Sequence, residues 1–116
     1  MEATTPVVLL KLLDCLSLRS QVIAENIANA STPRYRPLRV SFEDALKAAV
    51  PVGDAAVTAV EPVVHPANGA QGGDELRLDL ELASAASTAG RYGTVIELLN
   101  RHLQLDELAI SGGRSA

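Results

Sequence analysis

The chain has 116 residues, a formal net charge of −4, and a composition that is 47% apolar but only 3% aromatic. This length allows one small domain, and the excess of acidic residues argues against a nucleic-acid partner held through phosphate contacts. Because Cys15 is the only cysteine, an internal disulfide and a zinc site built from cysteines are both excluded.

The apolar run at residues 7–13 superficially resembles the core of a signal peptide. However, Glu2 stands where such a peptide carries positive charge, and Lys11 and Asp14 interrupt the run. We therefore expect no cleavable signal peptide. The run is also too short and too charged to span a bilayer.

Residues 6–31 are expected to form the first of two long helices. Thr5 and Pro6 are typical of a helix start, with a hydroxyl at the N-cap and proline at the first helical position. Apolar residues then recur at alternating spacings of four and three, with one polar step at Ser20, which is the pattern of a coiled-coil seam. The seam consists of Leu9, Leu13, Leu16, Ile23 and Ile27, and it continues to Ala30.

The first helix is expected to end in a polar turn. Thr32 precedes Pro33, and the residue before a proline is pushed toward extended geometry. The side-chain oxygens of Asn29 and Ser31 compete with continued helix for the local backbone groups.

The same stretch carries a family resemblance. Residues 26–35 read Asn-Ile-Ala-Asn-Ala-Ser-Thr-Pro-Arg-Tyr, which resembles the N-terminal signature of the bacterial flagellar axial proteins of the rod, hook and hook–filament junction. Arg34 departs from the family, which usually has glycine there, and an arginine would be strained if the position needs a positive φ. The residues that the resemblance assigns to assembly and to the turn are Asn26, Ile27, Asn29, Thr32, Pro33 and Tyr35.

Residues 32–75 are expected to form the turn, a short helix and a flexible loop. Residues 34–40 should be extended or irregular. Ser41 followed by Asp44 predicts a capping box that starts a helix through Ala49, with Phe42 anchoring it to the first helix. The prolines and glycines of residues 51–73 predict a loop with no fixed fold, although residues 57–64 could form a brief strand.

A second long helix is expected over residues 76–111. Its middle contains Gly90 and Gly93, which cost about 1 kcal/mol each in a helix. A kink would explain them, but the heptad phase continues through them, which favours close approach to another helix. Gly112 and Gly113 should end the helix. Its seam repeats every seven residues at Leu82, Ala89, Ile96, Leu103 and Ile110, with a second row at Ala85, Tyr92 and Leu99.

The predicted fold is therefore mainly α, with two long terminal helices that form a coiled-coil-like pair joined by a Pro/Gly-rich irregular loop with a short helix. The second helix is similar to the C-terminal segment of one of two sister proximal rod proteins. The other sister typically has a Met-rich lead, which residues 80–83 lack, and it stays the nearest alternative. The similar pieces are the Asp79-x-Glu81 opening, Arg91-Tyr92, Leu98-Leu99 and the close at residues 108–110.

The resemblance implies a structural subunit of the flagellar basal-body proximal rod, a single rod domain over residues 1–116 that spans the periplasm. Such a subunit would polymerise through its terminal helices into the drive shaft for motility. Its partners would be its own copies, other rod proteins, the MS-ring protein, the rod adaptor and the type III export apparatus. The narrow apolar seams are consistent with such polymerisation, because each needs neighbouring subunits to bury its apolar side chains.

Other functions find less support in the sequence. No enzyme activity, cofactor, metal or small-molecule substrate is expected, because His102 has only Asp106 at helical ligand spacing and neither a Gly-x-Ser-x-Gly turn nor a phosphate loop is present. The acidic residues at positions 74–81 suit a helix start. Arg34, Arg36 and Arg39 fit either an acidic protein partner or a solvated turn. A soluble helical adaptor or export chaperone is the alternative from another class.

Overall fold

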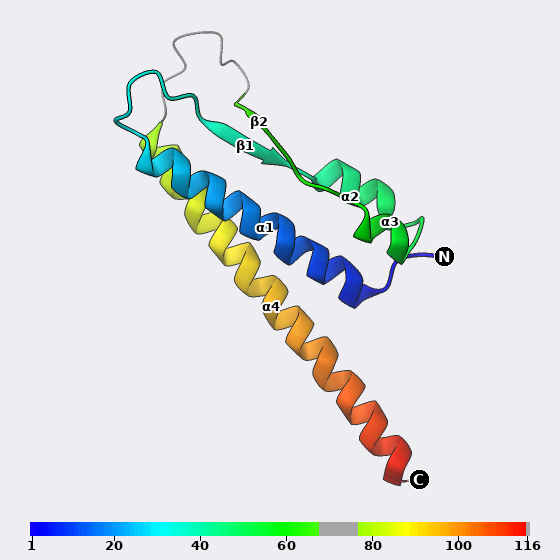
Figure 1. The fold of residues 1–116 in the computed structure, drawn as a ribbon. Coiled ribbons are helices and arrows are strands. Elements are labelled where there is room, and N and C mark those ends of the chain that lie inside the picture. Colours follow the sequence, from blue (N-terminus) through cyan, green and yellow to red (C-terminus); the bar gives the residue numbers. More distant parts are fainter. Residues whose placement is uncertain (68–76, 116) are drawn as a thin grey trace.

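The computed structural model of the chain describes residues 1–67 and 77–115, with side chains through residue 112. Figure 1 shows two long helices, α1 and α4, which run side by side in opposite directions, and a small middle segment packed on α1. The predicted mainly α fold is confirmed. The elements in order are α1 (Thr5–Ala28), β1 (Leu38–Ser41), α2 (Glu43–Ala49), α3 (Asp54–Thr58), β2 (Val63–Pro66) and α4 (Leu78–Ser115).

Helix α1 begins and ends slightly earlier than predicted. Its N-cap is Thr4 rather than Thr5, and neither hydroxyl caps the helix. Instead, the Thr4 N–H and hydroxyl donate to the two carboxylate oxygens of Asp54, at 2.5 and 3.2 Å. The predicted Thr5 cap is wrong because the chain start is held by α3, a tertiary contact that no local pattern reveals.

The middle segment is more ordered than the sequence predicted. Strand β2 pairs antiparallel with β1, so that Leu38 lies opposite Pro66 and Ser41 opposite Val63. A two-stranded ribbon has free edges, which is where a proline such as Pro66 is tolerated. Residues 51–67, predicted to be an unstructured loop, thus contain α3 and β2. The rest of the predicted loop, residues 68–73, lies outside the described residues.

The hydrophobic core lies mainly between α1 and the middle segment. On the α1 seam, Leu9, Leu16 and Ile23 are buried, and Leu13 and Ile27 are half-buried. This seam is therefore largely covered within the chain. Among its described residues, α4 adds one buried apolar side chain to the core, Val95; the middle segment adds Val40, Phe42, Leu46, Ala49, Val57 and Val60.

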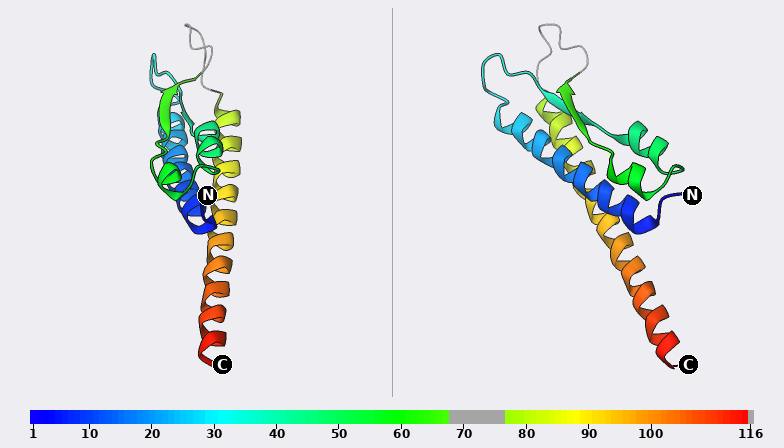
Figure 2. Two further views of the ribbon diagram at one scale, coloured as in Figure 1. Left: turned by 90° about the vertical axis from the view of Figure 1, so that its right-hand side faces the viewer. Right: turned by 45° about the vertical axis from the view of Figure 1, so that its right-hand side comes forward.

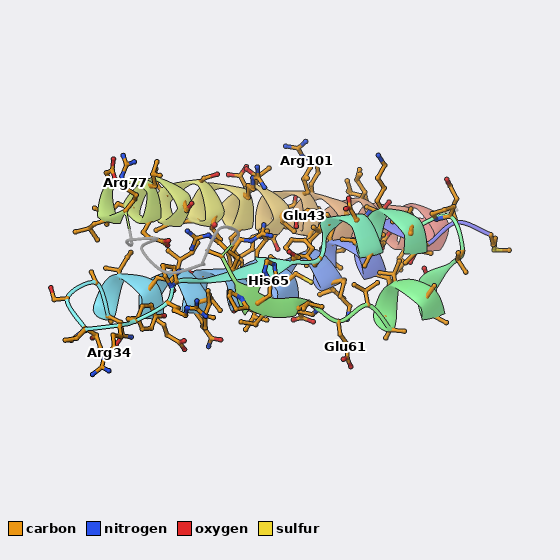
Figure 3. All side chains as sticks on the ribbon, turned by 90° about the horizontal axis from the view of Figure 1, so that it is seen from above. Arg34, Glu43, Glu61, His65, Arg77 and Arg101 are labelled. Carbon is orange, nitrogen blue, oxygen red and sulfur yellow. The ribbon has the colours of Figure 1, made fainter. Side chains whose placement is uncertain are left out.

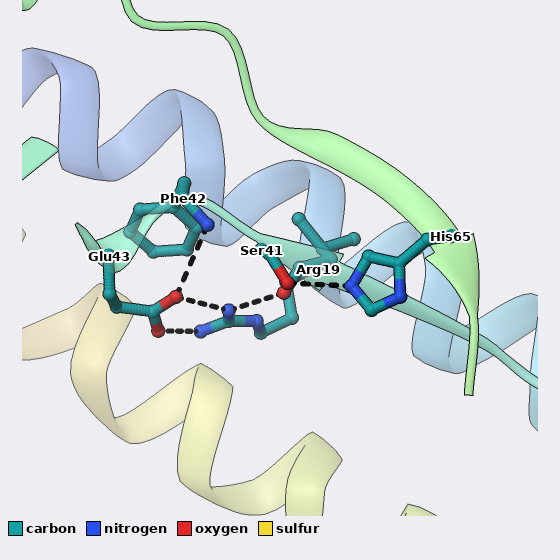
Figure 4. A network of polar contacts seen from close by, with 6 residues as sticks. Arg19, Ser41, Phe42, Glu43 and His65 are labelled. Carbon is teal, nitrogen blue, oxygen red and sulfur yellow. Dashed lines mark hydrogen bonds and ion pairs between the residues drawn. The ribbon is translucent and has the colours of Figure 1, made fainter. Parts of the chain in front are cut away.

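Phe42 anchors α2 to α1, as predicted. Its buried ring lies under the guanidinium of Arg19 from α1, 4.6 Å from the ring centroid. Arg19 also donates to both carboxylate oxygens of Glu43, at 2.6 and 2.8 Å, and to the Val40 carbonyl at 2.7 Å (Figure 4). One arginine thus ties helix, strand and helix together.

The predicted capping box at Ser41 is wrong. Ser41 is the last residue of β1, and the N-cap of α2 is Phe42, without a side-chain cap bond. The Ser41 hydroxyl lies 2.6 Å from His65 Nε2 on the paired strand (Figure 4). Because His65 Nδ1 lies 2.9 Å from the Pro66 carbonyl, which can only accept, Nδ1 carries the proton toward it. Strand pairing therefore engages the hydroxyl that the local pattern assigned to the helix.

Helix α4 is longer than predicted and extends past the start of α1 (Figures 1 and 2). It continues through Gly112, where the sequence pattern predicted its end. A Cβ built on Gly90 or Gly93 would meet nothing within 4 Å. The close helix approach predicted at these glycines is therefore not made within the chain.

Candidate assembly site

Asn26 is the buried centre of the turn motif. Its Nδ2 donates to the Leu38 carbonyl at 2.9 Å and to Glu81 Oε2 at 3.2 Å. Its Oδ1 accepts from the Tyr35 hydroxyl at 2.8 Å and from the Leu38 N–H at 3.0 Å. These four bonds use the full hydrogen-bonding capacity of the amide. We call Asn26, Tyr35, Leu38, Arg39 and Glu81 the Asn26 hub.

Glu81 joins the start of α4 to this hub. Its side chain is 2% exposed, and Oε1 lies 2.6 Å from Nη1 of Arg39. A buried carboxylate is tolerated when it is both paired and hydrogen-bonded, as here by Arg39 and Asn26. Glu81 lies in the first turn of α4, as predicted, but it is buried rather than left facing solvent, because the chain turns α4 against the end of α1 at this point.

The neighbouring acidic residues behave differently. Asp79, also in the first turn of α4, is exposed, and its Oδ2 lies 3.0 Å from Nη2 of Arg77. Asp74 and Glu75 lie outside the described residues. Arg39 is engaged by Glu81, whereas Arg34 points away from the body in Figure 3. The predicted basic cluster is therefore divided.

Tyr35 brings the far end of the turn back to Asn26. Burial of its ring raises the pKa of the hydroxyl, and the nearby carboxylates of Glu25 and Glu81 raise it further. The hydroxyl therefore stays protonated at neutral pH and can donate to Asn26 Oδ1. The phenol thus acts as a structural donor.

The turn itself is closed by Asn29 and Thr32. Asn29 Nδ2 donates to the Glu25 carbonyl at 2.9 Å, satisfying an acceptor at the end of α1. Thr32 returns two bonds to Asn29, from its hydroxyl to Oδ1 at 3.1 Å and from its N–H to the carbonyl at 2.9 Å. The polar residues of the motif thus replace the helical bonds that α1 loses.

Arg34 adopts the backbone conformation that makes glycine favourable. The Tyr35 N–H donates to the Thr32 carbonyl at 3.2 Å, closing a four-residue turn with Pro33 second and Arg34 third. Arg34 has a φ of +63°. Proline in the second position and positive φ in the third are the features of a type II turn, whose third position favours glycine. The exposed arginine is therefore strained.

Most of the predicted α4 seam is exposed, although Ala89 and Tyr92 border a small cavity shared with Ser17 and Ser20 of α1. Leu82 and Leu103 are 53% and 54% exposed, and Ile96 and Ile110 are 37% and 59% exposed. The buried residues of α4 occur one position earlier in the repeat, at Glu81, Thr88 and Val95. Of the other seam positions, Ala89 and Tyr92 are exposed and Leu99 is half-buried. One heptad face thus meets α1, and the adjacent apolar face is uncovered.

The distal part of α4 has the most exposed apolar surface. Leu98, Leu105 and Leu108 are exposed in addition to Leu103 and Ile110. So many exposed apolar side chains on one helix segment mark it as an interaction site on a folded protein. None of the described helices has the length and apolar character needed to cross a membrane.

Sequence reasoning placed Glu81 in an acidic helix start and Arg39 in a basic cluster, but it missed that the two residues pair in the hub. Glu81, Thr88 and Val95 are seven residues apart and therefore share a helix face. That spacing could have placed Glu81 on the face toward α1. The basic cluster marked Arg39 as able to bind a carboxylate, but nothing in the sequence identified Glu81 as that carboxylate.

Comparison with known proteins supports a flagellar relationship over part of the chain. No family model matches. The chain is 53% identical over 38 residues to the flagellar basal body rod protein FlgB of Borrelia hermsii, which covers 33% of this chain and 28% of that protein. It is 51% identical over 37 residues to FlgB of Borreliella burgdorferi, covering 32% and 27%. The matched region spans little more than a quarter of these relatives.

Proposed function

We propose that this chain is a structural subunit of the proximal rod of the bacterial flagellar basal body, of the FlgB type, and not an enzyme. The observation that carries the proposal is the uncovered apolar face of α4, at Leu82, Ile96, Leu103 and Ile110. The similarity to two FlgB proteins indicates that the flagellar rod is the assembly in which neighbouring subunits would cover this face.

In this role the chain has two mechanical parts. The first is the body, in which α1 is packed against the middle segment and held to α4 by the Asn26 hub. The second is the exposed face of α4, which packs against neighbouring subunits and so polymerises the chain. The hub fixes the angle between the helices. Torque applied to α4 is then passed to the body, as a drive shaft for motility requires.

The proposal includes a location and partners. The subunit lies in the basal body, spans the periplasm as part of the rod, and leaves the cytoplasm through the type III export apparatus. Its neighbours are copies of itself, the rod proteins FlgC and FlgF, the MS-ring protein FliF and the adaptor FliE. The turn residues, including Ile27, Thr32 and Pro33, set the shape that these neighbours meet.

Two alternatives are separated by specific observations. The sister rod protein FlgC is disfavoured by the absence of a Met-rich lead at residues 80–83, and both matched relatives are FlgB proteins. A soluble helical adaptor or export chaperone would be stably helical along its whole length when isolated. Circular dichroism should show one cooperative melt of the full helical content for an adaptor, and partial helicity for a rod subunit.

Incorporation into basal bodies tests the proposal. In the native host, an epitope-tagged chain should copurify with basal bodies, and the double variant Leu103→Ser, Ile110→Ser should be lost from them. Ala48→Ser, on the exposed side of α2, is the matched control and should be incorporated normally. Absence of the unmodified chain from basal bodies would refute the proposed role.

A further inference from the structure

A groove opens between α1, α4 and the start of α2. It has a volume of about 600 Å³, and its apolar walls include Leu12 and Leu16 of α1, Phe42 before α2, and Val95 of α4. Gly90 lies at its edge on α4, where an added Cβ would meet nothing within 4 Å. The groove therefore has room for an incoming side chain beside a bare stretch of helix backbone.

The charged residues at this groove are not balanced. Glu43 lines it, but both of its carboxylate oxygens are held by Arg19. Arg91 also lines it and makes no hydrogen bond or ion pair with any described part of the chain. The groove thus offers an apolar floor next to an unpaired guanidinium. It suits an apolar side chain that is accompanied by a carboxylate.

The distal end of α4 has the complementary chemistry. Leu103, Asp106, Glu107 and Ile110 are three or four residues apart and form one helix face. Leu103 and Ile110 are exposed, and residues 103–110 contain two carboxylates and no lysine or arginine. The carboxylate of Glu107 has no partner among the described residues. Since α4 projects beyond the body, this face is free to reach another molecule (Figure 2).

We propose, resting on the proposed role as a polymerising subunit, that the groove of one copy binds the distal face of α4 from a second copy. Leu103 and Ile110 of the incoming helix enter the groove and contact its apolar walls near Gly90, and Glu107 pairs with Arg91. The two surfaces are different patches of the same chain. The contact is therefore head-to-tail, and it can extend to further copies instead of closing as a dimer.

Two glycine variants test the occupancy of the groove. Gly90→Leu fills the edge of the groove, whereas Gly93→Leu adds the same side chain at an equally open helix position that does not line it. Both changes favour helix formation over glycine. Sedimentation velocity of the full chain at rising concentration should show self-association for Gly93→Leu and at least tenfold weaker association for Gly90→Leu. Equal association, or none in the unmodified chain, would overturn the proposal.

A charge exchange tests the pairing of Arg91 with Glu107. Arg91→Glu and Glu107→Arg should each weaken association about tenfold, because an attractive contact becomes repulsive. Mixing the two variant chains should restore association, since residue 91 in the groove of each variant then meets a residue 107 of opposite charge on the distal face of α4 of the other. Failure of the mixture to associate, or a different protein bound at the groove in cross-linked cells, would overturn the proposal.

These results are separable from the test of the rod role. If Gly90→Leu and Gly93→Leu enter basal bodies equally and associate equally, the rod role stands and the head-to-tail contact is refuted. If the unmodified chain associates through the groove but never copurifies with basal bodies, the contact stands and the rod role is refuted.

Discussion

Asn26 and Glu81 lie 55 residues apart in the sequence, yet their side chains are hydrogen-bonded at 3.2 Å in the interior of the protein. This bond joins the end of α1 to the start of α4. It also places a residue of the flagellar-like turn motif against the helix that carries the uncovered face. The motif therefore acts as a joint between the two long helices, as well as a turn.

Replacing Asn26 should loosen this joint. Asn26→Ala leaves the Tyr35 hydroxyl, the Leu38 backbone and Glu81 without their shared partner, and we expect the free energy of unfolding to fall by about 3 kcal/mol. Asn29→Ala, which removes an outer bond of the same turn, should cost about 1 kcal/mol. Urea denaturation followed by circular dichroism measures both. Equal losses of unfolding free energy in the two variants would show that the Asn26 hub stabilises the fold no more than an outer bond of the turn does.

Replacing Arg34 should relieve backbone strain. A left-handed conformation costs an L residue about 1–2 kcal/mol, and the extra chain entropy of glycine offsets part of the gain. Arg34→Gly is therefore expected to raise the free energy of unfolding by about 0.5–1 kcal/mol. Ser31→Gly is the control, because Ser31 lies in the same turn but does not have a positive φ, whereas Arg34 does. A stabilised Ser31→Gly, or a destabilised Arg34→Gly, would contradict this account of the turn.

The Arg19–Glu43 pair should make stability depend on acid pH. Hydrogen bonding to Arg19 lowers the pKa of Glu43 from 4.5 to about 2. The folded state therefore holds this proton more weakly than the unfolded state. The resulting stability is fully present above pH 4.5 and is lost as the pH falls toward 2.

Glu43→Gln checks this dependence. Glu43 is half exposed, so after solvent screening the pair contributes about 1 kcal/mol at pH 7. The difference in unfolding free energy between the two proteins should shrink steadily below pH 4.5. Asp44→Gln, at the neighbouring exposed carboxylate, should show no comparable change. A difference that is constant from pH 7 to pH 2.5 would exclude the pair as its source.

The single thiol reports whether α1 is covered in the isolated chain. Cys15 is fully buried, and burial raises the pKa of its thiol. Its modification by a thiol reagent should therefore be at least a hundredfold slower in the folded chain than in urea, because it requires opening of the core. Modification at the same rate in both conditions would mean that α1 and the middle segment do not pack without partners.

The sequence correctly predicted helices where apolar residues recur with a strong helical period. It failed to predict local structure that depends on contacts with residues distant in the sequence. Three residues of the predicted α1 seam, Leu9, Leu16 and Ile23, are buried. Its cover was not foreseen, because β2 and α3 lie in a stretch whose prolines and glycines suggest a loop. A two-stranded ribbon needs only one partner strand, and local composition does not identify that partner.

The site shows the same division. The end of α1 follows from local turn chemistry, which a sequence displays, whereas the preference for glycine at position 34 came from the resemblance to the flagellar axial proteins. The burial of Glu81 depends on Asn26 and Arg39, two residues brought to it by the tertiary fold. The α4 heptad at Leu82 and Ile96 was recognised, but its direction relative to α1 depends on packing that shifts the buried face by one residue.

Hydrogen–deuterium exchange across α4 tests the central claim most directly. The claim is that the face at Ile96, Leu103 and Ile110 is uncovered in one chain and covered by neighbouring subunits in the rod. Amides of residues 98–112 should exchange rapidly in the isolated protein and be protected at least a hundredfold in purified basal bodies, while those of residues 15–26 are slow in both. Slow exchange of residues 98–112 in the isolated chain, unchanged on assembly, would contradict it.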